Sequence, residues 1–127
     1  MNDKLGGLVM RMQGTLVFLP AALIVEVGPV PQITRVPGAP DDLLGIALHR
    51  DELVPVIAIG PAREAMVICS WGGENVALVG AKILAANVFE ADGPTTVLFA
   101  GERAHVLDLA SIYERVRVGR WGGRWGG

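Results

Sequence analysis

The chain has 127 residues, of which 51% are hydrophobic and 19% are charged. This is the size of one domain, and the apolar content can fill a sizeable core, which excludes a largely disordered chain. The formal net charge of −2 gives no general attraction to nucleic acid or acidic membranes. Cys69 is the single cysteine, so no intrachain disulfide can form, and its apolar neighbours indicate a buried, inert thiol in a cytoplasmic protein.

The N-terminal quarter is predicted to contain two strands and one helix. The strands are expected at residues 7–13 and 15–19, and the helix over residues 20–27, because Pro20 suits the first position of a helix. Ile24 and Val27 are three residues apart and would share one helical face beside Glu26. The apolar run at residues 16–25 is too short to span a membrane, which takes about 20 residues.

Residues 36–59 are the most informative part of the sequence. Two prolines and a glycine at residues 37–40 predict a turn, and two apolar runs at residues 43–48 and 53–59 predict a hairpin. The corner between the runs is charged and reads His49-Arg50-Asp51-Glu52. Such a hairpin would hold Arg50 rigidly at its tip, which favours recognition over reaction. From these residues alone, a surface arginine paired with Asp51 or Glu52 is the preferred interpretation.

Gly60-Pro61 is the predicted boundary between two lobes, at residues 7–60 and 61–116. A second hairpin is expected at residues 65–70 and 75–79, around the turn Trp71-Gly72-Gly73-Glu74. Extended segments are predicted at residues 82–90, 96–99 and 104–107. Asp108 is a suitable N-cap for a last helix that runs to Arg115.

The C-terminal residues 117–127 contain a direct repeat of Arg-Trp-Gly-Gly. A disordered terminus is one interpretation. The alternative is a short docking segment that uses its arginines and tryptophans, namely Arg120, Trp121, Arg124 and Trp125.

No catalytic, phosphate-binding or metal-binding motif is found in the sequence. Ser70 and Ser111 have no histidine or acidic partner at a recognisable spacing, and the two histidines and one cysteine lie far apart. We therefore expect neither an enzyme nor a bound cofactor or metal.

Several segments resemble the CheW-like coupling domain of bacterial chemosensory systems. Residues 24–27 (IVEV) resemble the V-x-E-I/V segment of the family, and residues 33–40 (ITRVPGAP) are similar to its ITPVPGAP-like turn. Residues 45–50 (GIALHR) and 54–57 (VPVI) resemble its hairpin, and residues 106–109 (VLDL) its closing helix start. The resemblance extends from about residue 8 to residue 115, with Asp51 in place of a family glycine.

The resemblance implies a mainly β fold, with two intertwined, five-stranded, SH3-like barrels, a short internal helix, a C-terminal helix and a groove between the barrels. It also implies a non-catalytic cytoplasmic adaptor, recruited to receptor clusters, that links the cytoplasmic tips of methyl-accepting chemoreceptors to the regulatory domain of a CheA-type histidine kinase. The partner-binding residues implied or favoured in this way are Ile24, Glu26, Val27, Gly45, His49, Arg50 and Asp51.

Two other functions stay open at the sequence level. The second half of the chain departs more from the family pattern, which leaves open an accessory adaptor or brake that binds the receptor and not the kinase. The Arg/Trp repeat leaves open a small-barrel nucleic-acid binder, although the acidic remainder of the chain argues against it.

Overall fold

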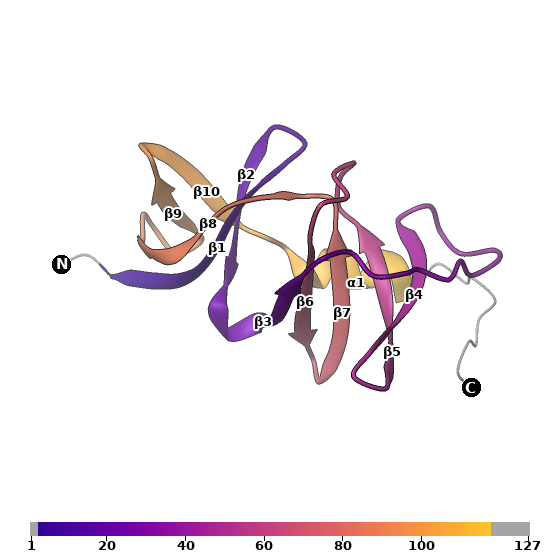
Figure 1. The fold of residues 1–127 in the computed structure, drawn as a ribbon. Helices are drawn as coiled ribbons and strands as arrows, with labels where there is room; N and C mark the ends of the chain where they lie inside the picture. Colours follow the sequence, from indigo (N-terminus) through magenta and orange to yellow (C-terminus); the bar gives the residue numbers. More distant parts are fainter. Residues whose placement is uncertain (1–2, 118–127) are drawn as a thin grey trace.

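The computed structural model describes residues 3–117. These residues form ten β-strands in two five-stranded sheets, one short 3₁₀ turn and one C-terminal α-helix (Figure 1). The predicted fold class, mainly β with two five-stranded units and a closing helix, is confirmed.

Sheet 1 has the strand order β8-β1-β2-β10-β9. Its strands come from both ends of the described chain: β1 (Lys4–Met12), β2 (Thr15–Pro20), β8 (Lys82–Glu90), β9 (Thr96–Phe99) and β10 (Glu102–Val106). All neighbours in this sheet are antiparallel except β2 and β10, which run parallel.

Sheet 2 has the strand order β3-β6-β7-β5-β4 and uses one continuous part of the chain. Its strands are β3 (Ile24–Gly28), β4 (Leu43–His49), β5 (Glu52–Ala58), β6 (Met66–Trp71) and β7 (Glu74–Val79). The two predicted hairpins are β4–β5 and β6–β7, and β5 pairs parallel with β7.

The predicted division into residues 7–60 and 61–116 does not match the sheets. Strands on both sides of Gly60-Pro61 belong to sheet 2, because β5 pairs with β7 across this break. The real crossover to sheet 1 follows Val79, where the backbones of Gly60 and Gly80 touch: a Cβ atom on Gly60 would lie 2.5 Å from the Gly80 carbonyl oxygen. A Gly-Pro pair ends a strand but does not determine which sheet the next strand joins.

The helix predicted over residues 20–27 was wrong for most of its length. Only Ala21–Leu23 form a helical turn, of 3₁₀ type, and β3 begins at Ile24. Ile24, Val25 and Val27 are β-branched, which suits a strand, and β3 pairs with β6 along its length. Ile24 and Val27 therefore do not share a helical face.

Each sheet encloses its own apolar cluster. In sheet 1 the cluster includes Val9, Phe18, Phe89 and Val97, and the rings of Phe18 and Phe89 meet edge to face at 6.0 Å. In sheet 2 the equivalent cluster is built from non-aromatic apolar side chains of β4 to β7, namely Ala47, Val54, Val56, Met66, Ile68, Ala77 and Val79. Each sheet therefore curls around its own barrel-like interior.

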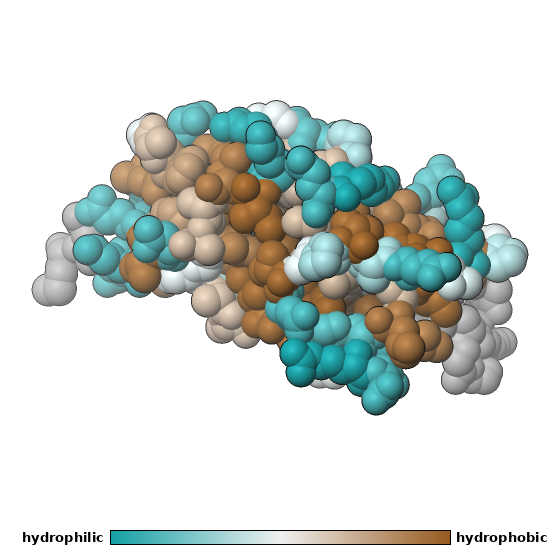
Figure 2. Space-filling view, in the orientation of Figure 1, coloured by the Kyte–Doolittle hydropathy of each residue, from teal (hydrophilic) through white to brown (hydrophobic). Residues whose placement is uncertain are grey.

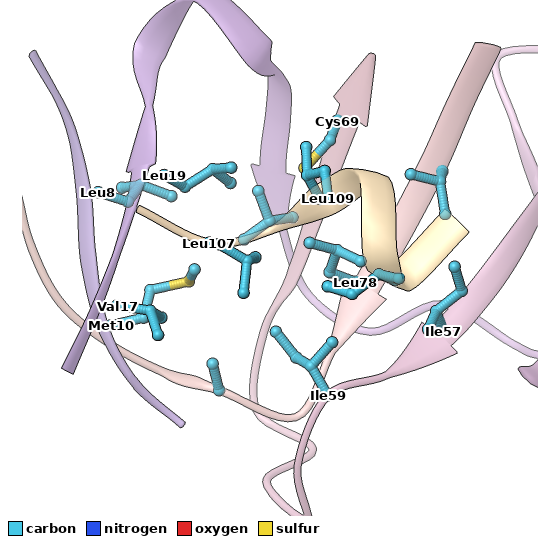
Figure 3. Packing of buried hydrophobic residues seen from close by; sticks show 14 of the residues in the cluster. Leu8, Met10, Val17, Leu19, Ile57, Ile59, Cys69, Leu78, Leu107 and Leu109 are labelled. Carbon is cyan, nitrogen blue, oxygen red and sulfur yellow. The ribbon is translucent and has the colours of Figure 1, made fainter. Parts of the chain in front are cut away.

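A third and larger cluster joins the two sheets through the helix α1 (Leu109–Arg117). In Figure 3, Leu109 of α1 lies beside Cys69 of sheet 2 with Leu78 below it, while Leu107 lies toward Leu8, Leu19 and Val17 of sheet 1. Cys69 is fully buried here, and burial raises the pKa of its thiol to about 12, so the expected inert thiol fits its surroundings.

Candidate functional site

The tip of the β4–β5 hairpin is a two-residue turn made of Arg50 and Asp51. His49 and Glu52 form the last pair of the ladder, and the two turn residues have positive φ angles of 51° and 66°. Two left-handed residues in succession are the geometry of the tight hairpin turn that matches strand twist. Arginine is uncommon in this conformation, and such backbone strain is concentrated at functional positions.

Arg50 forms an ion pair with Glu26, at the middle of β3. Its Nη2 atom donates to Oε1 of Glu26 at 2.9 Å, and its Nε atom donates to the same oxygen at 3.2 Å. The Arg50 side chain is 78% exposed, and that of Glu26 is 38% exposed. Because Nε and Nη2 donate to Glu26, the N–H groups of Nη1 remain available to donate to a partner.

This contact closes sheet 2. β3 and β4 are its two edge strands, separated in the ladder by β6, β7 and β5. The Glu26–Arg50 ion pair connects the turn after edge strand β4 to the opposite edge strand β3. The two residues are 24 positions apart in the sequence. Two residues predicted to bind a partner are therefore brought together, and the predicted alternative, in which Arg50 pairs with Asp51 or Glu52, is not the observed arrangement. Asp51 itself is exposed at the tip.

His49 lies next to this pair, and its side chain is mostly buried. Its side chain is 14% exposed, and its Nε2 atom lies 3.7 Å from Oε1 of Glu26, too far for a hydrogen bond. This nitrogen has no hydrogen-bond partner among the described residues. The imidazole lies close to the Glu26 carboxylate without a hydrogen bond and adds little surface to the site.

Gly45 shapes the hairpin from a distance. The segment before β4 forms an isolated bridge in which Thr34 and Ile46 exchange both backbone hydrogen bonds at 2.8 Å. A Cβ atom on Gly45, whose φ is +152°, would lie 2.1 Å from the carbonyl oxygen of Thr34. Glycine at this position lets residues 33–36 lie against the outer edge of β4.

Exposed apolar side chains lie on the same strands as the ion pair, and most of them were not predicted. Val27 of β3 was predicted as a binding residue, and its side chain is 43% exposed. Val25 on the same strand is 48% exposed. The larger contribution comes from Leu48 and Leu53, which are 65% and 54% exposed and face each other across the hairpin. Figure 2 shows apolar residues at the surface over sheet 2, bordered by hydrophilic ones.

Ile24 is half-buried and packs against the cluster between the sheets, so it belongs to the core more than to the exposed surface. The signal for Leu48 and Leu53 was present in the sequence: a two-residue turn at residues 50–51 places these leucines opposite each other, two pairs from the tip. The predicted tail residues, Arg120, Trp121, Arg124 and Trp125, lie outside the described residues.

A groove of about 650 Å³ lies between the sheets, at the start of α1. Met12 and Val17 of sheet 1, Ile59 after β5, and Leu107 and Ile112 at α1 line it. Within residues 3–117, no group of His, Cys, Asp or Glu side chains is arranged to hold a metal ion. No helix in the same range has the length and apolar character needed to cross a bilayer.

These features define a class of protein with two curled five-stranded sheets, a helix across their junction and an exposed hairpin tip. The family model of the CheW-like domain matches residues 6–83, which is more than half of the chain. The chain belongs to the CheW-like domain family.

Among solved structures, the fold is similar to the crystal structure of the scaffolding protein TtCheW from Thermoanaerobacter tengcongensis. The two share 18% sequence identity with a TM-score of 0.69, over 85% of this chain and 90% of that one. At this identity the likeness concerns the fold. No curated protein sequence matches the chain.

Proposed function

We propose that this chain is a cytoplasmic chemosensory adaptor that couples methyl-accepting chemoreceptors to a CheA-type histidine kinase in the control of motility. It acts through protein–protein contacts at receptor clusters and catalyses no reaction. Membership of the CheW-like family supports the adaptor role. We choose the hairpin tip as the binding surface because of the Glu26–Arg50 ion pair. The tip is exposed, and its two turn residues have positive φ angles.

The chemistry of this surface suits recognition of a helical partner. Arg50 is held in position by Glu26, so less side-chain freedom is lost when it meets a carboxylate or carbonyl groups. Val27, Leu48 and Leu53 add exposed apolar area on the same three strands, β3, β4 and β5. Arginine is one of the residue types enriched among interface hot spots, which neighbouring contacts shield from water.

The test is binding of Arg50→Ala and Glu26→Ala to a receptor tip fragment and, separately, to the kinase regulatory domain. Loss of an interface arginine costs about 2–4 kcal/mol, so the Kd for at least one partner is expected to rise by about 30- to 700-fold. Arg103→Ala is the matched control, because Arg103 is 70% exposed and also pairs with a carboxylate, Asp92, at 2.6 Å on sheet 1.

Unchanged affinity of Arg50→Ala for both partners, with the fold intact by circular dichroism, would remove this surface from the proposal. The melting temperature of Arg50→Ala is expected to stay close to that of the wild type, because exposed ion pairs contribute at most about 1 kcal/mol.

A second candidate is an accessory adaptor that binds the receptor and not the kinase. The family match supports this candidate, because it ends at residue 83. Most of β8 and all of β9 and β10 lie beyond it. A receptor–kinase phosphorylation assay separates the two roles: a coupler sustains kinase activity when added, and a brake lowers it.

A further inference from the structure

Two adjacent hollows flank the exposed side chain of Leu53 on sheet 2. The first, here called the apolar hollow, has a volume of about 280 Å³, and its lining combines Pro31, Ile46, Ala47, Leu48 and Leu53 with the polar residues Gln32 and Thr34. The second, here called the acidic hollow, has a volume of about 380 Å³. Its walls are Leu53, Pro55, Asn75 and the carboxylates of Glu52 and Glu74. Leu53 is the wall that the two hollows share.

The acidic hollow carries uncompensated negative charge. Glu52 and Glu74 are exposed, and Glu52 accepts one hydrogen bond, from the side-chain amide of Asn75 at 3.2 Å. No cationic residue is among those that line this hollow. The chemistry that matches this lining is a cation with some apolar surface beside it, to contact Leu53 and Pro55.

The C-terminal helix brings the end of the described chain to this place. The hydroxyl of Tyr113 donates to the carbonyl oxygen of Glu74 at 3.0 Å, which fixes α1 beside the β6–β7 turn. Arg117, the last residue of α1, follows Tyr113 by four residues, an advance of about 6 Å along a helix. Figure 1 shows the β4–β5 and β6–β7 turns at the same end of sheet 2.

Ten residues follow Arg117, and their chemistry complements the two hollows. Residues 118–127 contain two arginines, two tryptophans and no acidic residue. The tryptophans are four residues apart, so an extended chain separates them by about 13–14 Å, and the whole segment can reach about 33–36 Å. The segment is therefore long enough to present one Arg-Trp repeat to each hollow.

We propose that residues 118–127 dock within the same molecule onto the surface around Leu53. Arg120 and Arg124 neutralise Glu52 and Glu74, while Trp121 and Trp125 cover Leu53 and its neighbours in the two hollows. The docked segment occupies Leu48 and Leu53, the hairpin pair next to His49 and Glu52, so it competes with a partner that binds this end of the hairpin. This last consequence rests on the proposed adaptor function, whereas the docking itself does not.

Tryptophan fluorescence of the full chain tests the docking. The protein has three tryptophans, so Trp71→Phe leaves only Trp121 and Trp125 to emit. Their emission is expected at shorter wavelength in the folded chain than in denaturant, because the indoles leave water. Adding Leu53→Asp is expected to shift the emission to the denatured position, and raising the salt concentration is expected to shift it part of the way.

Val88→Asp is the matched control, since Val88 is 56% exposed on sheet 1, away from the hollows. This variant should leave the emission unchanged. Emission of the folded Trp71→Phe chain already at the denatured position would overturn the proposal. An equal response to Val88→Asp and Leu53→Asp would do the same. A blue shift that disappears on dilution would mean that the segment docks onto a second copy, which also overturns docking within one molecule.

A second measurement covers the case in which Leu53→Asp fails to fold. Amide NMR spectra of the full chain and of its Trp121→Ala/Trp125→Ala variant should differ at Leu53, Glu74 and Asn75. Differences confined to residues 118–127 would refute the docking. The receptor and kinase binding assays play no part in either measurement, so failure of the adaptor proposal and failure of the docking are distinguishable.

Discussion

Gly45 shows how a residue with no side chain can determine the shape of the hairpin surface. The carbonyl oxygen of Thr34 occupies the space that any Cβ atom at Gly45 would need, and the methyl carbon Cγ2 of Ile33 lies only 2.8 Å from the same point. The bridge between Thr34 and Ile46 depends on this close approach. The resemblance to the family selected Gly45 as a supporting residue, and the backbone contact gives the physical reason.

Gly45→Ala is therefore expected to destabilise the protein by about 2–3 kcal/mol, because it adds both a clash and an unfavourable φ. Urea unfolding measures this cost. Gly28→Ala is the matched control on β3, since a Cβ atom at Gly28 meets nothing within 4 Å. Equal stability of the two variants would show that the Thr34 segment moves away from β4 without cost.

The Glu26–Arg50 contact marks the limit of what the sequence could predict at the residue scale. The charged corner between two apolar runs placed Arg50 at a hairpin tip, and the structure confirms this position. Its partner could not be derived in the same way, because Glu26 is 24 residues distant and lies on the opposite edge strand. Only the closure of sheet 2 brings the two together.

The elements differ in how well local sequence determined them. The hairpins β4–β5 and β6–β7 were predicted because tight turns and apolar runs are local signals. β3 was missed because Pro20 and the following alanines favour a helix locally, whereas the strand is stabilised by its pairing with β6. The division into sheets was also missed, since it depends on the parallel pairs β5–β7 and β2–β10 between distant segments.

The helix α1 is the element whose start was predicted most directly. A side-chain oxygen of Asp108 accepts a hydrogen bond from the backbone N–H of Ser111 at 3.0 Å, which is the N-cap interaction expected from the sequence. Leu109 and Ile112 are buried on the face that meets the sheets. The cap therefore fixes where the helix begins, while the apolar positions Leu109 and Ile112 determine which face is buried.

Asp108→Ala is expected to lower the free energy of unfolding by about 1 kcal/mol, because it leaves an N–H group of the first turn without its partner. The midpoint of urea unfolding measures the loss. Asp108→Asn keeps an accepting oxygen and should retain most of the stability. An Asn variant as unstable as the Ala variant would contradict the capping role.

At the scale of the whole molecule, the cluster around α1 makes the two sheets one unit. It contains Leu8, Met10 and Val17 from sheet 1 and Ile57, Leu78 and other residues from sheet 2, with Leu109 between them (Figure 3). Each sheet also has its own interior cluster. If the sheets separated, however, the shared cluster would open and expose apolar area on both of them. We therefore expect the sheets to unfold together.

Leu109→Ala is expected to cost about 2–5 kcal/mol, because it empties a site that is 2% exposed between the sheets. Denaturant unfolding should remain a single transition, with the same midpoint by far-UV circular dichroism and by the fluorescence of Trp71 in a Trp121→Phe/Trp125→Phe background. The exposed position Ser111→Ala is the control and should change stability little. Two separate transitions in the wild type would refute the coupling of the sheets.

Sheet 1 can be completed only late in translation, because its strands lie on both sides of sheet 2 in the sequence. β1 and β2 are made first, yet their partners β8 and β10 are made only after all of sheet 2. At synthesis rates of about 5–20 residues per second, the interval from Pro20 to Lys82 lasts about 3–12 s. During that interval the nascent hairpin has open strand edges and an uncovered apolar face, so newborn chains are most prone to mispair with one another before translation reaches β8.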